Sequence, residues 1–361
     1  KSNHLSSLLE LFSVAIDFMS RSHTGPTELW VQVGDGNDHS WWGPPEMVHI
    51  YTKRPCFKID ERNPGSDVAA EVAASFAIAA ILVKMGLLPT FDGDDLINRS
   101  QQLLDFAVAY PARYSDSVPA AAEFYKSWSG FLDELVWASA WLIRAKQYYP
   151  TTKNYDSLIE QHYPSISGSD GWTHNWDDKR YGAYVLLSTL FPDNQKYRAD
   201  ATNSLNFWVE EVKRVNDIAW LTRWGALRYT SNACFLARVY NKHFPDVAYD
   251  IWSRKQLQLI IKSYVVGMYD NSPKNPHHRG SHSSPTASIQ EPPLNRIPLY
   301  GALVGGPDEN GQFKDERTDY VLNEVALDYN SGLTGALASL ATVPYTGGFP
   351  DYPKIEEIVT K

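Results

Sequence analysis

The sequence predicts an all-α fold, and three observations support that prediction. Apolar residues recur at helical spacing along most of the 361 residues. Strand-like runs such as LWVQVGD and YVVGM are few, and they do not alternate with helices as βαβ units would. No low-complexity linker or shift in composition interrupts the chain. We therefore predict a single domain over residues 1–361, built as a helical barrel of paired helices.

Ten segments carry apolar residues at the i, i+3, i+4 spacing of amphipathic helices. They are residues 3–21, 66–86, 94–109, 130–147, 153–163, 178–191, 195–213, 224–243, 247–264 and 321–341. The segment that starts near Ser66 is the clearest, because Ser66 can cap it and its alanines allow close packing. Its apolar run, Val72 to Val83, is too short to span a bilayer. A barrel of six helix pairs would need twelve helices, so about ten of twelve are present.

Long loops rich in Gly, Pro, Asn and Asp separate the helices. They cover residues 34–65, 110–129, 265–299 and 301–318. Loops of this length in a compact domain are usually functional. We expect them to gather at one end of the barrel and to form an open substrate cleft, while the helices serve as scaffold.

Composition narrows the classes of partner. The formal charge of −9 is offset by no basic tract, which argues against nucleic acid, anionic membrane surfaces and phosphate-rich substrates. Two cysteines are too few for a disulfide framework or a thiolate metal site. Aromatic residues make up 13% of the chain, with 12 Trp and 21 Tyr. Most of these rings belong in a core, but the excess leaves several that could line a groove.

The stretch DERTDYVLNEVALDYN, residues 315–330, has two readings. Glu324 lies near the predicted start of a helix, where carboxylates are common because the helix N-terminus stabilises negative charge. A general acid in a hydrolase needs the opposite environment, supplied by burial or by neighbouring carboxylates. Asp315, Asp319 and Asp328 are candidates for such neighbours. From the residues alone, both readings stay open.

The stretch NPHHRGSH, residues 275–282, places two imidazoles and a guanidinium next to a proline. His277, His278 and Arg279 can all donate hydrogen bonds to hydroxyls or to a carboxylate. A surface loop with chance histidines is the alternative. A zinc site is a poor interpretation, because adjacent histidines cannot easily ligate one ion.

Several tryptophans lie in or beside the long loops. In VGDGNDHSWWGPPE the glycines lack the GxGxxG spacing of a nucleotide loop. His39 with Trp41 and Trp42 resembles a sugar platform instead, on which C–H faces lie against an aromatic ring and hydroxyls meet polar edges. Similar rings stand at Trp128, Trp172 and Trp224. A cleft with such platforms fits a linear, neutral, hydroxyl-rich polymer.

The stretch SWSGFLDELVW offers hard oxygen ligands where a loop enters a helix. Ser129 and Gly130 are followed by Asp133 and Glu134, a set that suits Ca²⁺ better than Zn²⁺. A capping box formed by Ser129 and Asp133 explains the same residues equally well.

With these motifs in place, the chain resembles the catalytic module of glycoside hydrolase family 9, the inverting endo-β-1,4-glucanases. One family signature is matched at every required spacing, by Phe313, Asp315, Tyr320, Glu324, Ala326, Asn330 and Ser331. A second signature covers SYVVGMYDNSPKNPHHR and is matched except at Tyr269, where the pattern has Gly. Further family blocks, including RPCFKIDERNPGSDVAAE, WDDKRYG and LYGALVGGPDENG, follow in family order. The resemblance covers essentially the whole chain.

The resemblance implies an (α/α)6 barrel, secretion, and hydrolysis of a β-1,4-glucan polysaccharide such as cellulose, with no organic cofactor. Glu324 would be the general acid, with Asp315 and His277 as its active-site partners. The residues expected to bind the sugar are His39, Trp41, Trp42, Tyr125, Trp128, Trp172, Trp224, His278, Arg279, Arg317 and Tyr329. The residues that match the family's structural Ca²⁺ site are Ser129, Gly130, Asp133, Glu134 and Asp177, which favours calcium over the capping box.

One departure from the family concerns the second carboxylate. Inverting hydrolysis needs a general base roughly 6.5–9.5 Å from the acid, and the family supplies it from an Asp-Ala-Gly-Asp motif that this chain lacks. Residues 1–22 resemble the third helix of the barrel. We therefore expect the N-terminal part of the domain to be absent from this chain, with the base on an upstream segment or another chain. Such a chain alone would expose apolar helix faces and be poorly stable. A glucan-binding pseudo-hydrolase without activity is the alternative, and a barrel unrelated to carbohydrates a remote third.

Overall fold

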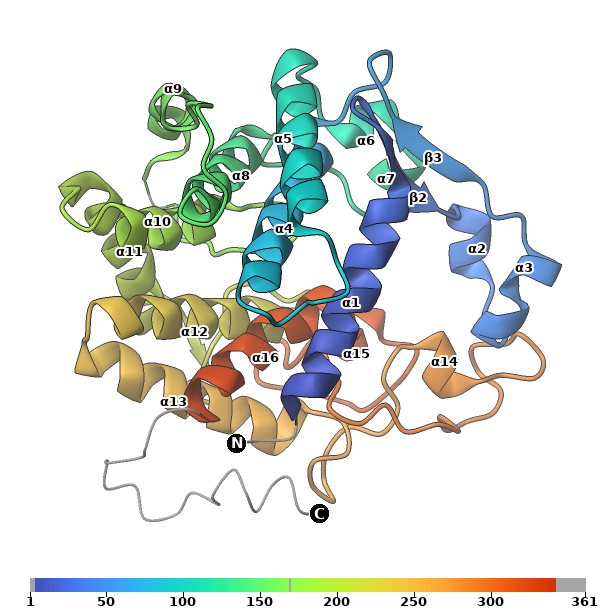
Figure 1. The fold of residues 1–361 in the computed structure, drawn as a ribbon. Coiled ribbons are helices and arrows are strands. Elements are labelled where there is room, and N and C mark those ends of the chain that lie inside the picture. The colour runs from blue at the N-terminus through green and yellow to red at the C-terminus, as the bar shows by residue number, and fades with distance from the viewer. Residues whose placement is uncertain (1–3, 169, 342–361) are drawn as a thin grey trace. The chain divides into compact units, whose positions relative to one another are not determined.

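The computed structural model describes residues 4–168 and 170–341, and it is largely helical, as the sequence predicts (Figure 1). Contacts between residues divide the chain into two compact units. Unit 1 comprises Lys1–Ser40, Thr52–Gly168 and Asp177–Tyr197. Unit 2 comprises Trp41–Tyr51, Ser169–Trp176 and Arg198–Lys361. Each unit is described separately below.

Unit 1 contains six of the ten predicted helices. They are α1 (His4–Ser22), α4 (Ser66–Lys84), α5 (Gly93–Ala109), α8 (Leu132–Ala145), α9 (Asp156–Ile166) and α10 (Arg180–Leu190). Short helices in its loops are α2 (Gly36–Ser40), α6 (Tyr114–Ser117) and α7 (Pro119–Ala122). An antiparallel sheet has the order β1-β2-β3, with β1 at His23–Gly25, β2 at Glu28–Val33 and β3 at Cys56–Ile59. Leu29 pairs with Ile59 in this sheet, and both side chains are buried.

The core of unit 1 forms around α4, which packs against α5 and α8. Ala69, Ala73 and Ala77 are fully buried on α4, and their short side chains let the neighbouring helices approach closely. By length and composition alone, α4 would pass as a membrane span. Since 61% of its apolar window is buried inside the protein, we interpret α4 as a core helix.

Unit 2 contains most of α11 (Gln195–Asn206) and the three remaining predicted helices. The latter are α12 (Ala226–His243), α13 (Val247–Tyr264) and α16 (Leu327–Ala341). Its shorter elements are η1 (Pro45–Met47), α3 (Val48–Tyr51), η2 (Phe207–Glu211), β4 (Arg214–Val215), β5 (Ile218–Ala219), α14 (Arg279–His282) and α15 (Tyr320–Asn323).

The helix α12 packs against both α13 and α16. Its contact with α16 is close because Gly332 faces it. A Cβ atom built on Gly332 would lie 2.8 Å from both the main-chain nitrogen and the Cα of Asn232. The missing side chain therefore sets the spacing of the two helices that flank the candidate site.

Two predicted helices differ from the structure. The segment 195–213 ends as α11 at Asn206 and continues as the wider turn η2. The segment 321–341 is divided into α15 and α16. The strand-like run YVVGM forms only one isolated bridge, between Val265 and Leu303.

Candidate active site

Glu324 lies in the break between α15 and α16, which corrects its predicted place in the first turn of one helix. Its main chain is non-helical, with φ −59° and ψ 144°. The N–H of His277 donates to the carbonyl of Asn323 at 2.8 Å, and His277 pairs with Glu324 as an isolated parallel bridge. Apolar periodicity continues on both sides of the break. At Glu324 itself, main-chain pairing with His277 interrupts the helix although the apolar pattern would continue it.

Two side chains donate to the same oxygen of Glu324. The indole Nε1 of Trp224 lies 2.7 Å from Oε2, and the hydroxyl of Tyr329 lies 2.9 Å from it. Tyr329 is 1% exposed. Burial chiefly raises the pKa of Tyr329 far above its ordinary value, so this side chain is a neutral phenol that donates.

Asp315 anchors the loop that carries His277 and His278. Its carboxylate accepts hydrogen bonds from the main-chain N–H groups of Lys274 and Asn275, both at 2.9 Å, and from Nδ2 of Asn275 at 3.1 Å. These bonds place the segment that continues into His277. The structure therefore brings Asp315 and His277 together with Glu324 in unit 2, with Asp315 in a supporting position.

The two histidines of this loop are held in different ways. Nδ1 of His277 lies 2.7 Å from the carbonyl of Arg317, so Nδ1 carries the hydrogen and donates it. Nδ1 of His278 accepts from the N–H of Ser281 at 3.1 Å and caps α14. Burial, followed by the charge of Arg279, lowers the pKa of His278. NH1 of Arg279 donates to the carbonyl of Trp41 at 3.0 Å.

Arg317 is buried, and its side chain contacts the loop of residues 289–295 instead of facing solvent. It is 4% exposed. Its three guanidinium nitrogens donate to the carbonyl of Ile289 at 2.8 Å, Oδ1 of Asn295 at 2.7 Å and the carbonyl of Pro292 at 2.8 Å. We therefore revise its predicted role from sugar binding to fixing the loop, because every nitrogen already has a protein acceptor.

Aromatic rings continue from Glu324 within unit 2. Trp224 is 48% exposed, and its ring centroid lies 5.3 Å from that of Tyr320, which is 49% exposed. Tyr320 in turn lies 5.9 Å from His277, against which Trp42 packs edge-on at 4.7 Å. Sequence reasoning did not include Tyr320 among the sugar-binding residues, although its place in the acidic signature marked it.

The other residues predicted to bind sugar differ in how they are packed: some stack on a neighbouring ring and others are exposed. Trp41 stacks on Tyr51 at 5.4 Å, and Trp172 packs against Tyr229 at 5.1 Å. In unit 1, His39 stacks on Phe124 at 4.3 Å. The remaining two candidates are exposed: Tyr125 at 46% and Trp128 at 71%.

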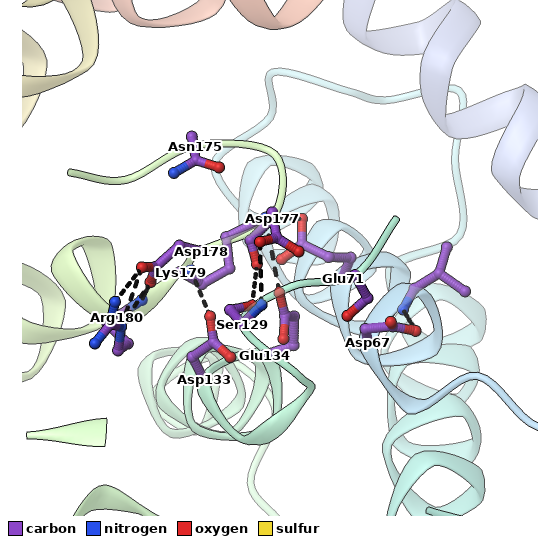
Figure 2. Close-up of polar contacts among 12 residues, drawn as sticks. Asp67, Glu71, Ser129, Asp133, Glu134, Asn175, Asp177, Asp178, Lys179 and Arg180 are labelled. Carbon is purple, nitrogen blue, oxygen red and sulfur yellow. Dashed lines mark hydrogen bonds and ion pairs between the residues drawn. The ribbon is translucent and has the colours of Figure 1, made fainter. Parts of the chain in front are cut away.

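Of the predicted calcium ligands, Ser129, Asp133, Glu134 and Asp177 lie in an acidic cluster of unit 1 that Figure 2 shows together with Asp67, Glu71 and Asp178. Asp177 accepts from the N–H groups of Trp128 at 2.8 Å and Ser129 at 3.1 Å, while Oγ of Ser129 donates to the carbonyl of Asp177 at 2.6 Å. Oδ2 of Asp133 accepts from the main-chain N–H of Lys179 at 2.7 Å. The carbonyl of Gly130 accepts from Ser127.

Sequence reasoning missed the cation in this cluster. Nζ of Lys179 lies 3.6 Å from Glu71 and 3.9 Å from Glu134, and its side chain is 5% exposed. Burial, and the neighbouring charge of Asp133, raise the pKa of Glu134. The position of Lys179 two residues after Asp177, in WDDKR, is the only signal that the sequence offered.

Two observations bear on whether Ca²⁺ fits this cluster. Oε2 of Glu134 and Oε1 of Glu71 are buried without a hydrogen-bond partner among the described residues, so two oxygens remain that a cation could satisfy. The oxygen donors are of the kind that Ca²⁺ prefers. Across residues 4–168 and 170–341, however, no group of three or more His, Cys, Asp or Glu side chains is arranged to hold a metal ion as it stands. The oxygen donors are therefore of the right chemical type for Ca²⁺, but the carboxylates would have to turn toward a common point to bind it.

Comparison with known proteins places these features in a family. The family model described as glycosyl hydrolase family 9 matches residues 1–337. Endoglucanase A of Bacillus pumilus is 37% identical over 377 residues, which cover 98% of this chain and 56% of that protein. Endoglucanase B of Cellulomonas fimi is 42% identical over 378 residues, which cover 97% of this chain and 35% of that protein. The chain thus spans about half the length of these relatives or less.

Solved structures show the same fold. The endoglucanase of the termite Nasutitermes takasagoensis is 35% identical, with a TM-score of 0.83 over 91% of this chain and 77% of that one. Endoglucanase CelQ of Clostridium thermocellum, solved in complex with cellotriose, is 32% identical, with a TM-score of 0.82 over 96% of this chain and 59% of that one. These similarities confirm the predicted fold class, that of the (α/α)6 barrels.

Proposed function

Because the chain belongs to glycosyl hydrolase family 9, we propose that it hydrolyses internal β-1,4-glucosidic bonds of cellulose or related β-glucans with inversion. The observation that supports this most directly is the environment of Glu324. A half-buried carboxylate accepts two hydrogen bonds on one oxygen and stands beside exposed aromatic rings. The relatives named above are endoglucanases, and one was solved with cellotriose bound.

In this proposal Glu324 is the general acid. Its proton passes to the glycosidic oxygen as the bond from that oxygen to the anomeric carbon breaks, and the bonding electron pair goes to the leaving oxygen. A water molecule attacks the anomeric carbon from the opposite face and gives its proton to a general base. Trp224 and Tyr329 fix the carboxylate, while His277 is tied to it through the main chain.

We propose that the general base lies on a polypeptide segment outside residues 1–361, which makes that segment a partner. The chain has no Asp-Ala-Gly-Asp motif. An exposed apolar stripe on α1 supports the idea, with Leu11 and Val14 each 69% exposed and Phe18 57% exposed. Residues spaced i, i+3 and i+7 share one helix face, so this stripe suits packing against another helix.

For the polymer, we propose binding on aromatic rings. Trp224 and Tyr320 beside Glu324 in unit 2 are each about half exposed, and Trp128 in unit 1 is 71% exposed. Cellulose cannot cross a membrane as a polymer, and for that reason we propose that the protein works outside the cell. The cysteines do not contribute a crosslink, because Cys56 and Cys234 are both free.

We also propose that the cluster of Ser129, Gly130, Asp133, Glu134 and Asp177 binds a structural Ca²⁺. The ion would supply positive charge to carboxylates that Lys179 only partly neutralises. Calcium at about 100 times its dissociation constant should stabilise the fold by about 2.7 kcal/mol, which calorimetry with Ca²⁺ and with EGTA can measure. Glu134→Gln should abolish the calcium effect. A melting temperature equal in both solutions would exclude the site.

The catalytic proposal is tested by reducing ends released from carboxymethyl cellulose. The chain is assayed alone and joined to the proposed upstream segment that would carry the base. We expect activity from the joined protein, its loss in Glu324→Gln, and its retention in Glu316→Gln, since Glu316 is a neighbour on the same stretch with a half-exposed side chain. Proton NMR should show the α-anomer as the first product. Glucan binding without turnover in either protein would favour the pseudo-hydrolase, and strong activity of the chain alone would refute the missing base.

A further inference from the structure

Both hydrogen bonds to the Glu324 carboxylate in the described part of the chain reach Oε2. An oxygen that accepts two such bonds is stabilised in its unprotonated form. The acid proton therefore belongs on Oε1, and the direction in which Oε1 points depends on how firmly the two donors are held. Trp224 precedes α12, and Tyr329 lies in the first turn of α16.

The ring of Tyr329 rests on the guanidinium of Arg228, which projects from α12. The centre of that guanidinium lies 4.6 Å from the ring centroid of Tyr329 and 4.6 Å from that of Tyr229. Its NH2 donates to the hydroxyl of Tyr229 at 2.9 Å, and its NH1 donates to Oδ2 of Asp328 at 3.0 Å. Arg228 is 8% exposed. Two rings and two hydrogen bonds thus fix the plane of the guanidinium.

Gly225 leaves the room in which the hydroxyl of Tyr329 sits. A Cβ atom at Gly225 would lie 2.6 Å from that hydroxyl oxygen and 3.3 Å from NH2 of Arg228. Gly225 also has a φ of +65°, a conformation that disfavours side chains. The same turn that presents Trp224 to Glu324 therefore makes space for the second donor. This arrangement joins Trp224, Gly225 and Arg228 into one support for the carboxylate.

We propose that Arg228 is a positioning residue for the proton transfer: by fixing the ring of Tyr329 it holds Oε2 of Glu324 as the acceptor and keeps the acid proton on Oε1. The inference rests on the proposed role of Glu324 as the general acid. Arg228 reaches the reaction only through Tyr329, so it is not a catalytic residue. A lysine cannot replace it, because an ammonium lacks the planar fork that stacks on two rings while donating in two directions.

The test compares Arg228→Lys with Arg238→Lys in the full-length protein. Arg238 lies on the same helix, is 6% exposed and pairs with Asp250, but it is ten residues, or about 15 Å, further along α12. Two substrates are used. Cellotetraose has a sugar leaving group that needs a proton, whereas 2,4-dinitrophenyl β-cellobioside has one that leaves without it.

For Arg228→Lys we expect kcat on cellotetraose to fall roughly 10- to 100-fold with KM nearly unchanged, while kcat on the dinitrophenyl substrate changes less than about 3-fold. Tyr329→Phe should show the same pattern, and Arg238→Lys should leave both substrates unaffected. Equal losses on both substrates in Arg228→Lys would overturn the inference in favour of a purely structural role. If Glu324→Gln instead keeps full activity on cellotetraose, the proposed function fails first.

A second readout does not need turnover. The indole ¹H–¹⁵N resonance of Trp224, assigned with Trp224→Phe, reports on its hydrogen bond to the carboxylate. We expect Arg228→Lys and Tyr329→Phe to shift this resonance, and Arg238→Lys to leave it in place. An unshifted resonance in folded Arg228→Lys protein would overturn the inference even if the protein proved inactive.

Discussion

Asp67 offers a test of how the acidic cluster of unit 1 affects stability. It lies at the start of α4 and is 5% exposed. Its carboxylate accepts hydrogen bonds from the N–H groups of Val68 at 2.8 Å and Tyr114 at 2.9 Å. Burial nevertheless raises its pKa from 3.8 to about 6. The substitution Asp67→Asn keeps an oxygen acceptor and removes the charge.

The sign and size of the effect follow from that pKa. The folded protein binds this proton more tightly than the unfolded chain does, so stability falls as the pH rises between about 4 and about 6 and stays reduced above that range. Each pKa unit corresponds to about 1.4 kcal/mol, which gives a full cost of ~3 kcal/mol. Since an amide oxygen is a weaker acceptor than a carboxylate, we expect Asp67→Asn to gain about 1–2 kcal/mol at pH 8 and almost nothing at pH 4.

Urea unfolding at pH 4, 6 and 8 measures this difference. Asp60→Asn is the matched control. Burial alone would raise the pKa of Asp60, but hydrogen bonds from the N–H groups of Asn63 and Arg62 lower it. Its contribution is lost as the pH falls, so Asp60→Asn should be less stable at pH 8 and should approach the parent protein at low pH. If Asp67→Asn is destabilised equally at all three pH values, its carboxylate is not the buried, costly group described here.

Three further changes probe other parts of the molecule. Lys179→Met leaves the carboxylates around it uncompensated and should cost about 3–5 kcal/mol in calorimetry, whereas Lys153→Met at an exposed pair should cost less than about 1 kcal/mol. Trp224→Phe removes a donor to the carboxylate of Glu324, the proposed general acid, and should lower kcat on cellotetraose roughly 10- to 100-fold; an unchanged kcat would refute its role. Gly332→Ala should destabilise by about 1–3 kcal/mol in urea, because α16 must move away from α12, whereas Gly25→Ala, whose nearest contact is 3.7 Å, should have little effect.

Helical periodicity predicted most of the scaffold. A helix is found in each of the ten predicted segments, and most of these helices bury an apolar stripe whose spacing is visible in the sequence. What the periodicity could not show is where tertiary contacts interrupt it. The break at Glu324 depends on main-chain pairing with His277, which lies 47 residues earlier, and no local pattern records such a partner.

The site was predicted less completely than the scaffold. Residue type singled out Glu324 and the tryptophans as candidates, but it could not distinguish a guanidinium that faces a ligand from one that holds a loop. Arg317 proved to be of the second kind, since its acceptors belong to residues 289–295. Lys179 and Arg228 were not identified from the sequence, for a different reason. Each lies inside a helical or loop segment whose pattern gives no sign that its charge is buried.

The break before α16 explains how Glu324 and Tyr329 can meet at all. On a continuous α-helix, residues five apart point about 140° away from each other around the axis, so a tyrosine at position 329 could not donate to a carboxylate at 324. The three non-helical residues turn the carboxylate back toward the first turn of α16, and the same extended backbone lets it pair with His277. Trp224 then approaches from the start of α12. Because α12 and α16 are held together at Gly332, the geometry of the carboxylate depends on the packing of two long helices as well as on the loop that carries it.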